Sequence, residues 1–120
     1  MKTVPDILEE AADLIETVGW TQGRHLERDQ DLNVIGYCAI GAIAQAVGLR
    51  CAATSVDEMV SRAQASARAE VHLNKWMEKK PGGRRGVVLW NDLPGRTAAE
   101  VIDALKQCAK DFRNKAVPDG

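Results

Sequence analysis

The segment from Tyr37 to Val47 constrains the fold more than any other part of the chain, because it is apolar on almost every side. Gln45 is its main polar exception, and Gly48 follows it directly. A helix that is apolar all round needs neighbours over most of its surface. The sequence therefore predicts a buried central helix over about residues 37–47, with other elements packed around it.

The composition indicates that those neighbours are also helices. The chain has 120 residues, enough for one modest core, and 45% of them are hydrophobic but only 4% are aromatic. Much of the apolar content is alanine, which favours close-packed helices over sheets. We therefore expect an all-α fold: one domain, a compact bundle of four to five helices around the central helix, with one long loop.

Three further helices have recognisable beginnings. The first runs from about Val4 to Val18, with Thr3 as its cap and Gly19 after its end. A second begins near Ser55, where Glu58 completes a capping-box pattern, and continues to about Lys79 as one helix or as two joined near 67–70. Its apolar stripe, which drifts around the helix, consists of Val56, Met59, Val60, Ala63, Ala67, Val71, Leu73, Trp76 and Met77.

The last helix begins at a second capping box, formed by Thr97 and Glu100, and its tail should fray from about Asn114. Between the helices, the polar segment 20–36 is predicted to be the long loop. Residues 87–90 are too few to assign, and would form either a short strand or one helical turn. Residues 91–96 are expected to form a turn.

Charge is distributed unevenly along the chain. Residues 1–31 contain eight acidic and three basic residues, whereas residues 75–85 contain five basic residues and one acid, Glu78. Such opposite surfaces can attract a partner protein or another copy of the chain. The candidate partner surfaces are the acidic first helix with its loop, and the basic loop that contains Lys79, Lys80, Arg84 and Arg85.

Several classes of function are disfavoured. The net charge of −1, and a basic loop without interleaved aromatics, argue against nucleic-acid binding. The histidines and cysteines are scattered without metal-ligand spacing, so we expect no metal and no cofactor. Three cysteines without a CxxC pair fit a reducing compartment. No secretory signal and no membrane-spanning run are visible, so we expect a cytoplasmic protein that does not enter membranes.

A thiol-dependent enzyme remains an alternative. Cys38 lies at the start of the predicted central helix, where the helix dipole lowers a thiol pKa. His25 or His72 would act as the base and Asp92 would orient it, as in a Cys–His–Asp arrangement. Structural burial is the preferred interpretation of Cys38, because cysteine commonly packs as a small hydrophobe.

Three short polar-aromatic segments lie at predicted helix ends: residues 20–23 (WTQG), residues 37–43 (YCAIGAI) and residues 90–92 (WND). If they converge, they form a binding pocket. If they do not, they satisfy helix ends and cover the core, which is the interpretation that we favour for Trp20 and Gln22. The candidate binding residues are Trp20, Gln22, Tyr37, Trp90, Asn91 and Asp92.

Together these motifs, extended to residues 90–101 (WNDLPGRTAAEV), resemble a family of small uncharacterised proteins from actinobacteria and their phages. The resemblance covers most of the chain. It implies a phage or prophage gene whose small product acts on a host or phage protein, in the host cytoplasm if the gene is phage-encoded. The leading hypothesis is therefore an interaction protein, and the alternative is a small-molecule-binding or thiol-dependent enzyme that uses Cys38.

Overall fold

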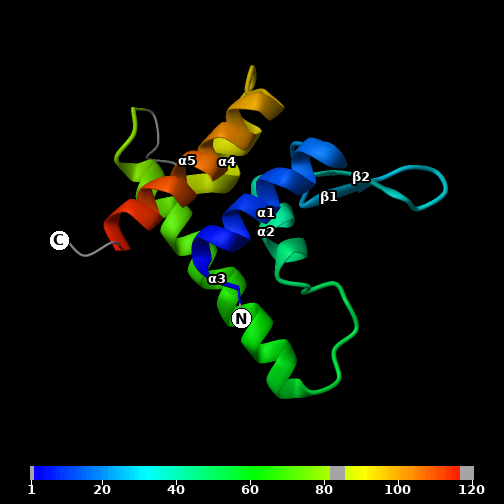
Figure 1. Cartoon of the computed structure of the whole chain (residues 1–120). Helices are drawn as coiled ribbons and strands as arrows, with labels where there is room; N and C mark the ends of the chain where they lie inside the picture. Colours follow the sequence, from blue (N-terminus) through cyan, green and yellow to red (C-terminus); the bar gives the residue numbers. More distant parts are fainter. Residues whose placement is uncertain (1, 82–85, 117–120) are drawn as a thin grey trace.

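The computed structural model describes residues 2–81 and 86–116. Over these residues the chain is mainly helical and compact, with five helices and one small antiparallel sheet (Figure 1). The elements are α1 (Val4–Thr17), β1 (Leu26–Arg28), β2 (Val34–Tyr37), α2 (Ala39–Ala46), α3 (Val56–Glu78), α4 (Gly86–Asp92) and α5 (Ala98–Ala116). No helix in this part of the chain is both long enough and apolar enough to cross a membrane.

Helix α1 lies at the centre of the bundle, where we expected the second helix to be. It packs against α5, α2 and α3, whereas the main helical contacts of α2 are with α1, α3 and α4. The predicted cap is confirmed, because Thr3 Oγ1 accepts a hydrogen bond from the backbone N–H of Asp6 at 3.3 Å. One face of α1 is buried, through Ile7, Leu8, Ala11, Ala12 and Ile15.

The segment predicted as a long loop contains a β-hairpin, so the all-α prediction was incomplete. Strands β1 and β2 pair antiparallel, with Leu26 opposite Tyr37, and the hairpin projects from the helices (Figure 1). Gly19 holds β2 against the end of α1: its carbonyl accepts the Tyr37 N–H at 3.0 Å. Its φ is +139°, and a Cβ there would lie 2.2 Å from the Ile35 carbonyl oxygen, so only glycine fits this approach.

Helix α2 begins later than predicted, because Tyr37 belongs to β2 and Cys38 is the N-cap. The helix is buried over most of its length, as its composition indicated. Gly41 allows the hairpin to cross it closely, since a Cβ at this position would lie 1.8 Å from the His25 carbonyl oxygen.

Helix α3 is one continuous helix of 23 residues, which resolves the choice between one helix and two. Ser55 caps it as predicted, by accepting the Glu58 N–H at 3.1 Å. The Glu58 carboxylate bonds Thr54 instead of returning to the Ser55 backbone. The predicted stripe was wrong for its first part: the buried face consists of Ala65, Ser66, Ala69, Leu73 and Met77.

The C-terminal part of the chain consists of two helices. Residues 87–90 form most of helix α4, which also includes Asn91 and Asp92, so the turn predicted at 91–96 begins later, at Leu93. The Thr97–Glu100 capping box is present, with both of its hydrogen bonds, at the start of α5. Helix α5 continues through Asn114 to Ala116, where we expected fraying.

Some acidic residues of α1 form ion pairs with α5 within the molecule. Arg113 on α5 contacts Asp6 at 2.7 Å and Glu9 at 2.5 Å, and Lys106 contacts Glu16 at 3.2 Å. These pairs use basic residues of α5, not those of the basic segment 75–85, and they help to align α1 with α5. The side chains of these pairs are half exposed, so each pair contributes little to stability.

Candidate functional site

The first and third polar-aromatic segments meet at Asn91, which is only 1% exposed. Its Oδ1 accepts hydrogen bonds from Trp20 Nε1 at 2.8 Å and from the Ala39 backbone N–H at 3.2 Å. Its Nδ2 donates to the Thr21 carbonyl at 3.1 Å and to Asp92 Oδ1 at 3.0 Å. The amide therefore uses both of its donors and accepts two bonds within the protein.

The neighbouring polar candidates also bond to the protein itself. Gln22 Nε2 donates to the carbonyls of Asn91 and Leu93, both at 3.0 Å. Asp92 Oδ1 accepts the Gly23 N–H at 2.9 Å. These side-chain groups therefore join the start of the hairpin to α4.

The three aromatic candidates do not share one wall. Trp20 pairs with Tyr37 through an isolated parallel bridge, and Tyr37 is buried. Trp90 belongs to a different surface: the Arg96 guanidinium lies 4.2 Å from its ring centre, and the ring lines a groove with Trp76. In this structure the hydrogen bonds of these segments therefore connect separate parts of the fold.

The catalytic candidates Cys38, His25 and Asp92 line one open cavity of about 410 Å³, together with Arg24 and Arg50. His72 lies elsewhere, packed edge-on against Phe112 with the ring centres 4.8 Å apart. Cys38 is 3% exposed, and its Sγ accepts the Gly41 N–H at 3.3 Å.

The environment of Cys38 does not activate its thiol. Burial raises the pKa of Cys38 most strongly, the hydrogen bonds from Gly41 and Ile40 oppose that rise, and the negative charge of Asp92 adds to it. A raised pKa leaves the thiol protonated near neutral pH, whereas nucleophilic catalysis needs the thiolate. Among the described residues, no cluster of His, Cys, Asp and Glu side chains could hold a metal ion.

A second surface is larger, and we call it the α3–α5 groove. It consists of two adjoining cavities of about 610 and 380 Å³ that share Trp76, between the C-terminal part of α3 and α5. Its apolar lining includes Trp76, Met77, Trp90, Ala104, Cys108 and Phe112. Six lysines also line it: Lys75, Lys79, Lys80, Lys106, Lys110 and Lys115.

Polar contacts hold the centre of this groove in place. Trp76 Nε1 donates to Asp111 Oδ2 at 2.7 Å, and Lys80 Nζ lies 4.6 Å from the centre of the Trp76 ring. Hydrogen bonds from Trp76 and then Gln107 lower the pKa of Asp111, and Lys80 and Lys115 lower it further. Asp111 is therefore a carboxylate at neutral pH, and Trp76 has a fixed orientation.

Only part of this groove was predicted from the sequence. Lys79 and Lys80 were candidate partner residues and lie on it, whereas Arg84 and Arg85 are outside the described residues. The lysines of α5 and Trp76 were missed. The signal that would have found them is helical spacing: Lys106 and Lys110 are four residues apart on one helix, as are Trp76 and Lys80 on another.

Comparison with known proteins finds a family model that covers most of the chain. No curated protein and no solved structure matches the chain significantly. Residues 1–111 match DUF6197, a family of unknown function, which spans the chain from α1 into α5. The chain therefore belongs to the DUF6197 family.

Proposed function

We propose that this chain is a binding protein whose α3–α5 groove takes an acidic segment of a partner protein. The observation that carries the proposal is the groove itself: an aromatic and aliphatic lining with lysines supplied by two helices. Aromatic anchors contribute strongly to protein interfaces, and charges at the rim steer and orient the partner.

The groove fits an acidic peptide better than a nucleic acid. Three carboxylates, those of Glu100, Asp103 and Asp111, lie among its lysines and would repel a continuous phosphate backbone. A cation already lies over one face of Trp76 and of Trp90, which reduces the ring surface open to stacked bases. A peptide needs only a few apolar side chains and a few acids at suitable positions.

The resemblance to actinobacterial and phage proteins suggests where the partner should be sought. We propose a phage or prophage origin and action in the cytoplasm of an actinobacterial host. A thiol-dependent enzyme is the competing proposal, supported by the shared cavity of Cys38, His25 and Asp92. The raised pKa of Cys38 weighs against it.

The test combines capture from an actinobacterial lysate with cross-linking from the groove. A photo-reactive amino acid replaces Gln107, an exposed residue of the groove lining, and the cross-linked peptides are sequenced. The charge-reversed variant carries Lys79→Glu, at the C-cap of α3, and Lys110→Glu, on α5. The matched control carries Arg24→Glu and Arg50→Glu, which make the same change in net charge at the other cavity.

We expect the cross-linked segment to be acidic, and its capture to fall about tenfold or more in the groove variant but not in the control, as for loss of charge pairs worth about 1.4 kcal/mol or more. Equal capture by the two variants would overturn the groove as the binding surface. Cross-linking to nucleic acid, with binding that weakens steeply with salt, would replace the protein partner with a nucleic acid.

A further inference from the structure

The N-terminal part of α3 exposes apolar side chains that the sequence pattern had indicated as core. Val56 is 74% exposed, Met59 57% and Val60 47%, and Ala63 and Ala67 are exposed on the same side. At 100° per residue these five positions fall within about 100° of one another around the helix. We call them the α3 stripe. Figure 1 shows this part of α3 extending beyond the other helices.

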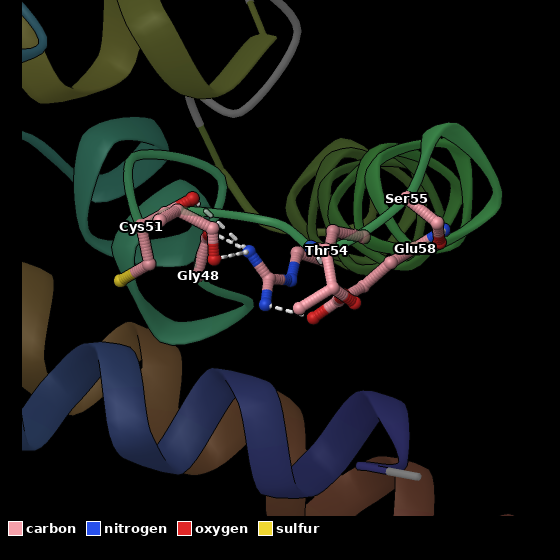
Figure 2. Close-up of polar contacts among 7 residues, drawn as sticks. Gly48, Cys51, Thr54, Ser55 and Glu58 are labelled. Atoms are coloured by element: carbon pink, nitrogen blue, oxygen red, sulfur yellow. Dashed lines mark hydrogen bonds and ion pairs between the residues drawn. The ribbon is translucent and has the colours of Figure 1, made fainter.

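The loop before α3 is held on a different side of the helix. Arg62 donates hydrogen bonds to the carbonyls of Gly48, Cys51 and Ala52, at 3.0, 3.1 and 3.3 Å, and pairs with Glu58. Figure 2 shows Gly48 and Cys51 on one side of this contact and the beginning of α3 on the other. Arg62 lies outside the stripe, about 60° around the helix from Met59 at the stripe's edge, so the loop is anchored beside the stripe and not over it.

The charges beside the stripe suit a second copy of the chain. Asp57 and Arg68 flank the same edge of the stripe, and among the described residues neither forms an ion pair within the molecule. If two α3 helices pair antiparallel about a point between Val60 and Ala63, the Asp57 of each copy lies about 3 Å along the axis from the Arg68 of the other. A parallel pair would instead place the Asp57 and Arg68 of the two copies on opposite edges of the contact, where they could not pair.

The apolar side chains are complementary in the same register. Val56 of one copy faces Ala67 of the other, and Val60 faces Ala63, so each valine meets an alanine. The alanines let the two helices approach closely. The stripe is about 18 Å long at 1.5 Å per residue, which gives a small interface. We therefore expect a reversible dimer that forms at high protein concentration.

We propose that two copies of this chain associate through an antiparallel pair of α3 helices, with the α3 stripe as the contact. The interface is separate from the α3–α5 groove, because the groove residues of α3 lie between His72 and Lys80. The proposal does not depend on the proposed function.

The first experiment is sedimentation of the full chain over a concentration series up to several hundred micromolar. We expect a monomer–dimer equilibrium, which Val60→Asp abolishes because it places a carboxylate in the stripe. Leu89→Asp is the matched control: Leu89 is 57% exposed but lies on α4. A wild-type chain that stays monomeric, or equal losses in the two variants, would overturn the α3 interface.

A charge exchange tests the antiparallel arrangement. Asp57→Arg alone and Arg68→Asp alone should each weaken the dimer about threefold to tenfold, because each places like charges opposite one another. The double variant restores the opposite pair and should recover most of the wild-type association. Both single variants should have the circular dichroism spectrum of the wild type, which would show that their helices are intact. Failure of the double variant to recover association would rule out the antiparallel register.

Discussion

At the scale of single residues, Asn91 joins parts of the chain that are far apart in sequence. Its side chain bonds Trp20, 71 residues away, and Ala39, 52 residues away. The sequence indicated that Asn91 has either a binding role or a structural role at a helix end. No local pattern specifies hydrogen-bond partners at such separations. Its near-complete burial and four hydrogen bonds identify a structural role, which composition and spacing could not decide.

We predict that Asn91→Ala lowers the free energy of unfolding by about 3 kcal/mol, because it leaves the Trp20 indole N–H, the Ala39 N–H and the Thr21 carbonyl without this partner. Asn91→Asp should also destabilise the fold, since it puts a carboxylate oxygen beside Asp92. Urea unfolding measures both. Asn114→Ala, an exposed change on α5, should stay within about 0.5 kcal/mol of the wild type.

The second residue-scale prediction concerns the three thiols, and it separates the binding proposal from a thiol enzyme. Burial raises the pKa of Cys38, and it raises the pKa of Cys108 to about 12. Cys51 is exposed. Alkylation at pH 8, followed by mass spectrometry, should therefore modify Cys51 first and the other two only slowly, while an unfolded sample reacts at all three. Labelling of Cys38 as fast as Cys51 in the folded protein would favour catalysis.

At the scale of elements, helix beginnings were predictable because their signals are local. Thr3, Ser55 and Thr97 all cap as expected, since each cap depends on a residue three positions later. The hairpin was missed because its strands have only three and four residues, too few for a clear alternation. It is held by tertiary contacts, including the bond from the Tyr37 N–H to the Gly19 carbonyl at 3.0 Å.

The faces of α3 show a second limit on what the sequence can predict. Its apolar residues follow helical spacing, which predicted the helix correctly, but they occupy two faces. Leu73 and Met77 enter the core, whereas Val56 and Val60 stay exposed. Periodicity indicates that a helix has apolar faces and does not specify which neighbour covers each. Bonds from Arg62 join α3 to the preceding loop, and a sequence pattern does not reveal them.

The carboxyl groups at two helix caps allow a prediction of how the stability of the fold changes at acidic pH. Hydrogen bonds from Thr54 lower the pKa of Glu58, and the bond from Arg96 lowers that of Glu100, both from an ordinary value of 4.5. A group whose pKa is lower in the folded state stabilises the fold above its unfolded pKa and loses that effect as the pH falls. The melting temperature should therefore change little between pH 7 and pH 5 and fall below about pH 4.5.

A double variant assigns this acid sensitivity to the caps. Glu58→Gln with Glu100→Gln keeps acceptors at both helix ends but removes the titrating groups, so its melting temperature should fall less steeply in acid. Glu70→Gln, a change outside either cap, should follow the wild-type profile. If the double variant also follows the wild-type profile, other carboxylates cause the acid sensitivity.

At the scale of the whole molecule, α3 carries both proposed surfaces. Its first part bears the stripe for a second copy, and its last part lines the groove for an acidic segment. An antiparallel pair of α3 helices would place the two grooves at opposite ends of the dimer. Two grooves in one particle allow bivalent capture, which strengthens binding to a surface or a repeated partner without any new contact.

We therefore predict that the two surfaces can be separated by mutation. Val60→Asp should give a monomer that binds the free acidic segment, identified by cross-linking, with wild-type affinity, because no groove residue has changed. Lys79→Glu with Lys110→Glu should lose that binding and still dimerise. On a surface densely coated with the segment, the wild type should dissociate at least about tenfold more slowly than the Val60→Asp monomer, because a dimer holds two sites at once. Calorimetry with the free segment and surface dissociation rates measure the two effects. Loss of free-segment binding in the Val60→Asp monomer would instead mean that the groove is completed only in the dimer.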